Sequence, residues 1–480
     1  MNAVEKYDVL VLGGGTAGKL MAWTMAKDGR RTAVVERKYI GGSCANVACL
    51  PSKNVIHSAK VASLVARHRE FGIETGPITI DMAGVYARKR AMVDGIVRVH
   101  LDKYQAAGDE VILGDGKFVA PRTLRVTLRD GGERTLTADH VFVNVGTHAT
   151  VPDTPGLREA KPLTHIEALD LQRRPEHLIV LGGGYVGLEL GQALRRLGSR
   201  VTLIARGSQL ASQEDADVAQ AILQLFRDEG IDVLLNTEIL RVSGLSGGRV
   251  SLQLQSGDST RSLDGTDILV AVGRTPNTSG IGLEKAGIEV TEKGHLRVND
   301  RLETTAPNVW AMGECAGSPY FTHVSEDDFG IIWQNLNGGH RSTTGRLVPY
   351  CVFIDPELAR VGLNESQARE SRVRYRVASV PVDAAWRPWT LSERRGFMKT
   401  LIAADSDRIL GFTAFGPEAG ELMGTVQLAM LAGLPYTILR DTMFAHPTMT
   451  EGLKALYMNV PQRLENPAGQ LQHARTSAPA

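Results

Sequence analysis

The sequence predicts an α/β fold with two Rossmann-like domains, followed by a C-terminal domain of the α+β class. An apolar run over residues 8–12 ends in three glycines, continues with apolar residues at helical spacing and reaches a second apolar run over residues 32–35. The same strand, helix, strand pattern returns over residues 177–205. From about Val348 the pattern changes to alternating strands and then helices, which is typical of an α+β domain.

The two glycine-rich segments are copies of one pattern. DVLVLGGGTAGKLMAWTMAKDGRRTAVVERK aligns without a gap to HLIVLGGGYVGLELGQALRRLGSRVTLIARG. In such motifs the glycines allow a tight turn and a close backbone approach, and the free N–H groups of the following helix bind a pyrophosphate. A glycine-rich turn without a ligand would explain one copy, but two aligned copies favour two dinucleotide sites. The glycines are Gly13, Gly15 and Gly18 in the first copy and Gly182, Gly184 and Gly187 in the second.

The residues around these copies set the domain limits. Residues 55–107 have a helical composition, and residues 111–145 alternate as strands that Gly and Asp interrupt. Gly146 closes the first domain before the proline-rich VPDTPG, and Gly273 closes the second in a similar way. We therefore predict domains over 1–150, 151–274, 275–347 (a continuation of the first, central domain) and 348–465, with a flexible tail over 466–480.

The composition excludes several classes of protein. The 480 residues include 54 basic and 53 acidic side chains, so the chain lacks the charge excess of a nucleic-acid or membrane-surface binder. No stretch approaches the roughly 18–20 apolar residues of a membrane-spanning helix, and the N-terminus lacks the pattern of a signal peptide. We therefore expect a cytoplasmic protein that acts on a small molecule. Four cysteines are too few for a disulfide scaffold, so a closely spaced pair indicates catalysis.

The residue at the end of the second strand of each copy distinguishes the two nucleotides. A carboxylate here hydrogen-bonds a ribose 2′-OH and repels a 2′-phosphate, whereas an arginine can bind that phosphate. The first copy has Glu36, and the second has Ala205 followed by Arg206. The second site is therefore expected to favour NADPH over NADH. The alternative is that Arg206 is a solvated surface residue.

A cysteine pair follows the first copy. Residues 41–53 read GGSCANVACLPSK, with Cys44 and Cys49 five positions apart and a helical stretch after them. Placed on a first helical turn, the two sulfurs can meet, and the positive end of the helix lowers a thiol pKa. The alternative is a pair of inert buried cysteines. This segment resembles the motif GGTCxNxGCxPSK of the class I pyridine nucleotide-disulfide oxidoreductases, the family of glutathione reductase, dihydrolipoamide dehydrogenase and mercuric reductase, with Ser for Thr and Ala for Gly.

The resemblance implies a role for each residue of this site. The first copy would bind FAD and the second NAD(P)H. Cys49 would be the sulfur beside the flavin, and Cys44 the outer sulfur that attacks the substrate. Lys53 would lie near the flavin and pair with Glu189, since a buried lysine needs an anion. Tyr185 would cover the nicotinamide pocket, with a plain packing role as the alternative.

Two later motifs continue the resemblance. NVWAMGE, which ends in Gly313 and Glu314, is similar to a family FAD motif that has Asp at the last position. The next segment, FTHV, would begin a helix that faces the flavin, and its His323 is interpreted as structural. HPTMTE contains His446 and Glu451, which resemble a general acid/base and the carboxylate that orients it. In relatives this histidine reaches the disulfide of the other subunit, which implies a homodimer.

The resemblance covers residues 8–457 and predicts an FAD-dependent NAD(P)H:disulfide oxidoreductase that reduces a disulfide or a metal ion. The phrases RLGSRVTLIARGS and FAHPTMTEGL are most similar to mercuric reductase and to related flavoproteins of copper or reactive-chlorine defence. The tail LQHARTSAPA lacks the vicinal cysteines of true mercuric reductases. No metal site is predicted, and Cys315 and Cys351 are interpreted as buried structural thiols, with a metal-responsive role as the alternative. NAD-linked dihydrolipoamide dehydrogenase and a non-catalytic NAD(P)-binding redox sensor are the competing functions.

Overall fold

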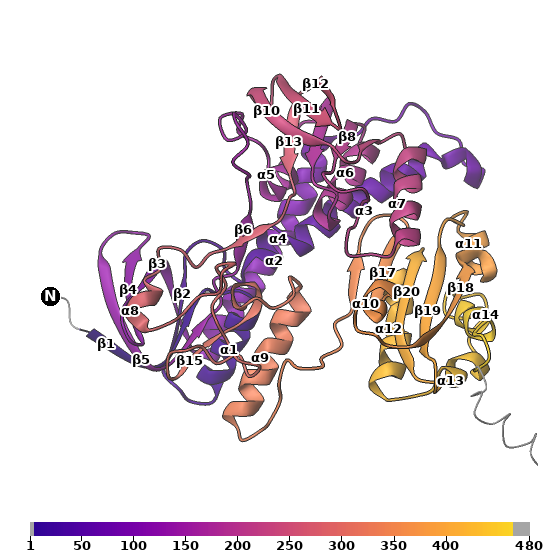
Figure 1. Cartoon of the computed structure of the whole chain (residues 1–480). Coiled ribbons are helices and arrows are strands. Elements are labelled where there is room, and N and C mark those ends of the chain that lie inside the picture. The colour runs from indigo at the N-terminus through magenta and orange to yellow at the C-terminus, as the bar shows by residue number, and fades with distance from the viewer. Residues whose placement is uncertain (1–3, 464–480) are drawn as a thin grey trace, which may run out of the picture. The chain divides into compact units, whose positions relative to one another are not determined.

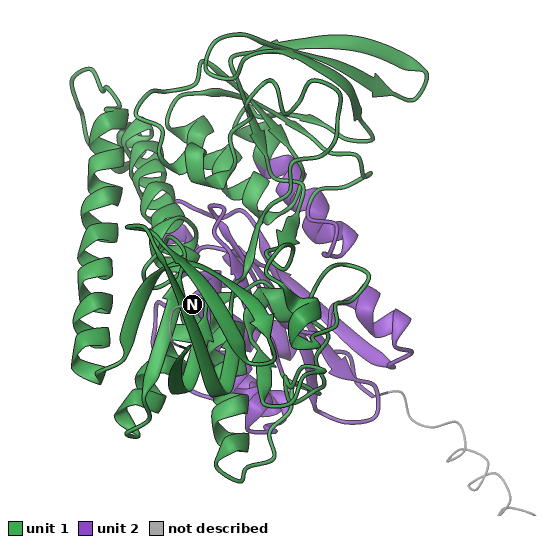
Figure 2. Cartoon of the chain, turned by 90° about the vertical axis from the view of Figure 1, so that its left-hand side faces the viewer, with its two compact units in different colours: residues 1–210, 226–346 green, residues 211–225, 347–480 purple. Residues whose placement is uncertain are grey.

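The computed structural model describes residues 4–463 and divides into two compact units, shown in Figure 2. The first unit comprises residues 1–210 and 226–346, and the second comprises residues 211–225 and 347–480. The predicted tail over 466–480 lies outside the described residues. Within residues 4–463, no helix combines the length and apolar character needed to cross a bilayer.

The first unit is built on a six-stranded sheet with a parallel core (Figure 1). Its strands β1, β2 and the start of β3 run parallel, β5 pairs parallel to both β1 and β15, and β3, β4 and β5 form an antiparallel meander. The strands are β1 (Val4–Leu12), β2 (Thr32–Glu36), β3 (Glu110–Ala120), β4 (Thr123–Leu128), β5 (Glu133–Val143) and β15 (Val309–Ala311).

Helices cover this sheet and carry most of the predicted site residues. Met21 and Met25 of one helix pack with Ile331 and Ile332 of another in a fully buried cluster on β1. The elements are α1 (Thr16–Lys27), α2 (Ser43–Asn46), α3 (Cys49–Ala66), η1 (His68–Phe71), α4 (Met82–Ala107), α8 (Leu283–Ala286), η2 (Gly313–Ala316) and α9 (Thr322–Leu336). The helical prediction for residues 55–107 was wrong over 72–81, where Gly and Pro interrupt the pattern.

The second glycine copy also forms a parallel sheet, in the order β13-β7-β8-β9. A separate three-stranded antiparallel sheet, β10-β11-β12, and the two-stranded sheet β14-β6 complete this part of the unit. The strands are β6 (Thr147–Ala149), β7 (His177–Leu181), β8 (Arg200–Ile204), β9 (Asp232–Leu234), β10 (Glu238–Gly244), β11 (Val250–Ser256), β12 (Ser259–Gly265), β13 (Asp267–Val270) and β14 (Arg274–Pro276). The helices of this segment are α5 (His165–Leu169), α6 (Tyr185–Arg196) and α7 (Ala216–Asp228), and most of α7 groups with the second unit.

The second unit contains a five-stranded antiparallel sheet in the order β16-β17-β20-β19-β18. Phe412, Leu422 and Leu453 belong to its buried core. Its elements are β16 (Tyr350–Val352), β17 (Glu357–Gly362), α10 (Glu365–Glu370), β18 (Tyr375–Pro381), η3 (Val382–Ala384), α11 (Arg387–Thr390), β19 (Phe397–Ala403), β20 (Ile409–Gly416), α12 (Ala419–Leu431), α13 (Tyr436–Asp441) and α14 (Gly452–Met458). The strands precede the last helices, as predicted for an α+β domain.

Residues 211–225 group with the second unit, although the predicted domain over 151–274 contains them. Within that unit, Asp215 accepts hydrogen bonds from the backbone N–H groups of Glu365 and Ser366. Lys399, which is 2 % exposed, donates to Asp215 at 2.9 Å. These buried polar contacts explain why the segment belongs with the C-terminal sheet.

Candidate active site

The two predicted sulfurs meet at a break between two helices. Cys44 lies in α2, and Cys49 is the first residue of α3. Ala48 separates the helices with a non-helical backbone (φ −128°, ψ −103°). The prediction of one helical turn was therefore wrong, and the reason is geometric: positions five apart in one helix point about 140° away from each other. The break allows a hydrogen bond between the two thiols.

This contact shifts the pKa values of the two thiols in opposite directions. The hydrogen bond from Cys44 lowers the pKa of Cys49 to about 6, with further stabilisation of the thiolate by Thr322 and Lys53 against the cost of burial. The same hydrogen bond, together with burial, raises the pKa of Cys44. Thr322 is the first residue of α9, and its Oγ1 lies 3.2 Å from Cys49 Sγ. The surroundings of the pair therefore favour the negative charge on Cys49 and the proton on Cys44.

An ion pair lies one turn further along α3. Lys53 Nζ is 2.8 Å from Glu189 Oε2, and Glu189 is 8 % exposed on α6. The pair joins the cysteine helix to the helix of the second glycine copy. Lys53 also contributes to the low pKa of Cys49 through its charge. The structure thus brings together the two residues that the resemblance paired.

The first glycine copy forms the turn between β1 and α1. A Cβ added at Gly13 would lie 2.4 Å from the carbonyl oxygen of Asn144, so a larger residue does not fit. At Gly18 it would lie 2.2 Å from the carbonyl oxygen of Gly13. Gly15 at the start of α1 makes no side-chain cap. The backbone N–H groups of Ala17 and Gly18 donate to Ser325 Oγ and Asn144 Oδ1, which leaves the N–H groups of Gly15 and Thr16 for a phosphate.

Glu36 ends β2 beside this turn. Its carboxylate accepts hydrogen bonds from the backbone N–H groups of Gly14, Lys38 and Tyr39 at 2.7–2.8 Å. The side chain therefore lies at the carboxyl edge of the sheet, where a Rossmann fold places the ribose of its nucleotide. The open helix start, the close glycine turn and this carboxylate fit the adenosine diphosphate half of FAD.

The second copy repeats the turn without the carboxylate. A Cβ at Gly182 would lie 2.4 Å from the carbonyl oxygen of Ala271. Gly184 precedes α6 with no side-chain cap, and Gly187 packs against the turn. Tyr185 is the first residue of α6, where it is half-buried. At the end of β8, Ala205 is buried and Arg206 is exposed.

Glu314 follows β15 and differs from the Asp of the family motif by one methylene. Its carboxylate contacts the Thr147 hydroxyl and lies 3.3 Å from Arg274 Nε. Gly146 and Gly273 have φ values of +65° and +134° just before the strands that carry Thr147 and Arg274. Gly313, at φ +71°, donates its N–H to Asp328 Oδ2. The longer side chain therefore faces Arg274 and Thr147.

The second unit holds the predicted acid/base pair. His446 Nδ1 lies 2.8 Å from Glu451 Oε2, with the histidine side chain 64 % exposed and the carboxylate 15 % exposed. Glu451 is the N-cap residue of α14, so its backbone position is set by the start of that helix. Because Nδ1 is engaged by Glu451, Nε2 is the ring nitrogen available to a second partner.

The remaining predicted residues make contacts of other kinds. His323 stacks on Phe321 with 5.4 Å between ring centroids. Cys315 is fully buried, and burial raises its pKa to about 11. Cys351 is half-buried, with Sγ 4.0 Å from Glu357 Oε2, so the prediction of a buried thiol was wrong for this residue, which packs at the margin of the core of the second unit. Within the described part of the chain, no cluster of three or more His, Cys, Asp or Glu side chains could hold a metal ion.

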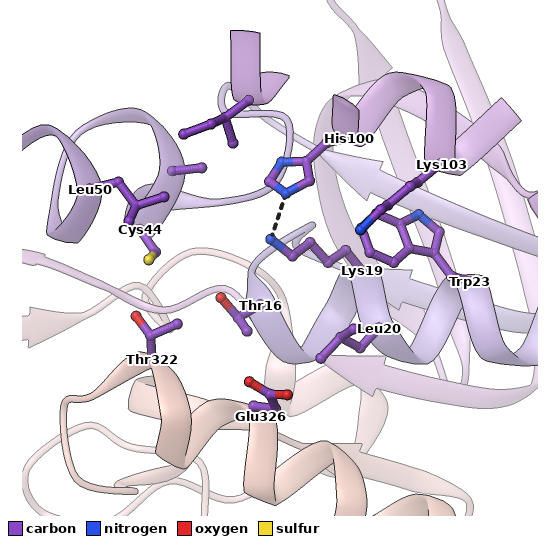
Figure 3. A pocket seen from close by; sticks show the side chains of 12 residues that line it. Thr16, Lys19, Leu20, Trp23, Cys44, Leu50, His100, Lys103, Thr322 and Glu326 are labelled. Atoms are coloured by element: carbon purple, nitrogen blue, oxygen red, sulfur yellow. Dashed lines mark hydrogen bonds between the residues drawn. The ribbon is translucent and has the colours of Figure 1, made fainter. Parts of the chain in front are cut away.

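A pocket of about 280 Å³ opens beside Cys44 in the first unit (Figure 3). Thr322 forms part of its wall, and so do side chains that the sequence did not indicate. These are Thr16, Lys19, Leu20 and Trp23 from α1, Ala45 from α2, Leu50 from α3, Ile96, His100 and Lys103 from α4, and Glu326 from α9. The residues come from five helices, so no local motif could have revealed the pocket.

Comparisons with known proteins place these features in a family. Residues 7–328 match the family model described as pyridine nucleotide-disulphide oxidoreductase, and residues 348–457 match its dimerisation domain. The sequence is 35% identical over 460 residues to the probable pyridine nucleotide-disulfide oxidoreductase RclA of Escherichia coli, covering 95% of this chain and 99% of that one. It is 34% identical to a mercuric reductase of Acidithiobacillus ferrooxidans (94% and 82% covered) and 32% identical to the mitochondrial dihydrolipoyl dehydrogenase of Dictyostelium discoideum (95% of both). A solved Cu(II) complex of the HOCl-induced flavoprotein disulfide reductase RclA superposes with a TM-score of 0.86, at 34% identity and with 95% and 99% of the chains covered.

Proposed function

Because this chain belongs to the pyridine nucleotide-disulphide oxidoreductase family and is an FAD-dependent oxidoreductase, we propose that Cys44 and Cys49 carry its electrons to a disulfide acceptor. The observation that supports this assignment is the geometry of the pair: the two sulfurs meet where α2 gives way to α3, and Thr322 Oγ1, 3.2 Å from Cys49 Sγ, and the Lys53 charge favour a thiolate on Cys49. The overall reaction would be NAD(P)H + H⁺ + RSSR → NAD(P)⁺ + 2 RSH.

The exchange at the sulfurs follows from this charge distribution. Cys44 loses its proton and attacks one sulfur of the acceptor, which forms a Cys44–S–S–R bond and releases RS⁻. The Cys49 thiolate then attacks Cys44 Sγ, which releases the second RS⁻ and forms the Cys44–Cys49 disulfide. Protonation of both leaving thiolates gives 2 RSH. The low pKa of Cys49 keeps it ionised for the second attack.

The remaining residues prepare the pair and its cofactor. The glycines of the first copy and Glu36 would hold FAD, which supplies two-electron chemistry between nicotinamide and sulfur when bound. Lys53 places a positive charge near Cys49, and its ion pair with Glu189 fixes that charge. Thr322 donates a hydrogen bond that favours the Cys49 thiolate. Gly146, Gly273, Gly313 and Glu314 would shape the remainder of the cofactor sites.

His446 would move the protons. Glu451 accepts from Nδ1, so Nε2 can take the proton of Cys44 and later deliver it to a leaving thiolate. The match of residues 348–457 to a dimerisation domain supports a homodimer, and we place His446 at the sulfur pair of the partner subunit. A dithiol pair of this kind also suits a reducing compartment, so we propose the cytoplasm.

The nucleotide is proposed to be NADPH. Ala205 leaves no carboxylate at the position that would repel a 2′-phosphate, and the exposed Arg206 beside it can bind one. Tyr185 and the second-copy glycines would form the rest of this site.

The proposal is tested by steady-state reduction of a panel of acceptors: glutathione disulfide, lipoamide, Hg(II) and Cu(II). We expect reduction of at least one disulfide, and a loss of several orders of magnitude when Cys44→Ser or Cys49→Ser removes one sulfur. Cys315→Ser, which changes a buried thiol outside the pair, should retain turnover. Disulfide turnover that survives either active-site substitution would contradict the assignment.

Nucleotide selectivity needs its own variant. Arg206→Ala should lower kcat/KM for NADPH by about tenfold or more, because a charge-assisted hydrogen bond contributes about 1.5–3 kcal/mol. The same change should leave kcat/KM for NADH within about twofold. Arg241→Ala, at another exposed arginine, serves as the control. Equal losses with both nucleotides would mean that Arg206 does not contact the 2′-phosphate.

A further inference from the structure

The pocket beside Cys44 contains two positive charges that have neutral partners. Lys19 Nζ lies 3.1 Å from His100 Nε2 and 3.4 Å from the carbonyl oxygen of Gly41. Lys103 Nζ and Lys19 Nζ lie 5.4 Å and 5.9 Å from the centroid of the Trp23 ring. Figure 3 shows both lysine side chains on the same wall as His100 and Trp23. Among the described residues, no carboxylate forms an ion pair with either lysine.

The support of Lys19 is built into the fold. His100 is 9 % exposed on α4, and burial together with the two lysine charges lowers its pKa to about 4. The ring is therefore neutral at physiological pH, and its Nε2 can accept a hydrogen bond from the Lys19 ammonium group. Gly41 approaches so closely that a Cβ there would lie 2.0 Å from His100 Nδ1. An ammonium group has three N–H bonds, and the two acceptors leave the third for a ligand in the pocket.

Placing an ammonium group in a partly buried pocket without an anion costs free energy. Burial lowers the pKa of Lys19, as expected for such a site. Of the residues that line the pocket, Glu326 is the one carboxylate; it is exposed on α9, as Lys103 is on α4, and its charge partly offsets the effect of burial on Lys19. The wall of the pocket that Lys19, Lys103 and His100 form is therefore suited to an anion and unsuited to a bare metal cation.

We propose that Lys19 and Lys103, with Lys19 held by His100, bind a negatively charged group of the acceptor while its disulfide faces Cys44. Trp23 would contact the carbon skeleton between the charge and the sulfur. The acceptor class is thus a small disulfide that bears a carboxylate. This inference rests on the proposed function, because it assumes that Cys44 is the attacking sulfur.

The first test compares an anionic and a neutral alkylating reagent on Cys44. The holoenzyme carrying Cys49→Ser is reduced, and peptide mass spectrometry follows labelling of Cys44 by iodoacetate and by iodoacetamide. The ratio of the two rate constants is divided by the same ratio for a free thiol. We expect a normalised ratio of about ten, because a cleft of one charge sign raises the local concentration of counter-ions by 10-fold or more.

Substitutions of lysines test whether the pocket causes the preference for iodoacetate. Lys19→Met should bring the normalised ratio near one, and Lys19→Arg should keep most of the preference because the charge remains. Lys117→Met, at an exposed lysine on β3 that does not line the pocket, should leave the ratio unchanged. A ratio near one in the parent protein, or a ratio that Lys19→Met does not change, would overturn the proposal.

The second test uses turnover of the otherwise unchanged holoenzyme with dithiodiglycolate and with its neutral diamide. Lys19→Met should raise KM for the dianion by about tenfold and leave KM for the diamide unchanged. Equal KM changes for the two substrates would overturn the anion site. If both disulfides are still reduced and both reactions require Cys44, the proposed function stands even then. Failure of Cys44→Ser to stop either reaction would instead overturn the function itself.

Discussion

The sulfur pair in the first unit and the histidine–carboxylate pair in the second unit are organised in different ways. Cys44 and Cys49 are half-buried free thiols that hydrogen-bond to each other, so each shifts the pKa of the other. The His446 side chain is 64 % exposed, and within residues 4–463 its hydrogen-bond partner is Glu451. The sulfur pair is therefore complete within one chain, whereas the histidine has an oriented ring with a free face.

This difference bears on the proposal that His446 acts on the sulfur pair of a partner subunit. An oriented but exposed general base has nothing to deprotonate in its own surroundings, and an attacking thiol with a raised pKa needs a base. Both needs are met if the two pairs combine across a dimer, as the dimerisation-domain match suggests. Evidence that His446 acts on the sulfur pair of its own chain would contradict this arrangement.

The largest effect is expected from His446. His446→Gln should lower disulfide turnover by about 10²–10⁴-fold, the usual contribution of a general acid/base. It should leave the Cys44 and Cys49 thiols chemically intact, as thiol counting under denaturing conditions would verify. Steady-state kinetics with the acceptor that the panel identifies provides the measurement.

Mixing two inactive variants sharpens this prediction. When His446→Gln and Cys44→Ser proteins exchange subunits, a trans arrangement gives heterodimers with one intact site and one doubly altered site. Random exchange should restore about one quarter of the parent activity, since about half of the dimers are mixed and each has one working site. No recovery after verified subunit exchange would mean that His446 serves the sulfurs of its own chain.

Much of this organisation can be predicted from sequence because it is encoded locally. Two glycine copies, each within about thirty residues, predict both nucleotide sites, since turn and helix geometry depend on near neighbours. Glu36 and Arg206 follow from the same alignment. The interruption of the helices over residues 72–81 was visible as Gly and Pro, but the helical composition of the wider segment outweighed it.

The parts that sequence did not reveal depend on contacts between distant segments. Thr322 meets Cys49 because α9 begins beside α3, a contact over 273 positions. The Lys19–His100 contact joins α1 to α4 over 81 positions. No periodicity or spacing links such residues, and an isolated lysine in a Rossmann helix has the appearance of a surface residue. Tertiary packing alone brings these groups to the sulfurs.

The smallest predicted effect concerns Thr322, whose hydroxyl lowers the pKa of Cys49 in the sulfur pair. Thr322→Val removes the hydroxyl that stabilises the Cys49 thiolate, so the pKa of Cys49 should rise from about 6 by about one unit, the equivalent of about 1.4 kcal/mol. Because the ionised form reacts, alkylation of Cys49 by iodoacetamide should slow near and below the old midpoint and stay unchanged at high pH. Peptide-resolved labelling of the reduced protein across a pH series measures this shift.

Thr322→Ser is the matched control, since it keeps the hydroxyl and removes only a methyl group. Its midpoint should stay near that of the parent, which separates the hydrogen bond from any change in packing at the start of α9. If valine and serine shift the midpoint equally, the hydroxyl contributes nothing and the Cys44 hydrogen bond and Lys53 alone hold the Cys49 thiolate. In that case the low pKa belongs to the cysteine segment and its ion pair, and α9 has only a structural part in the site.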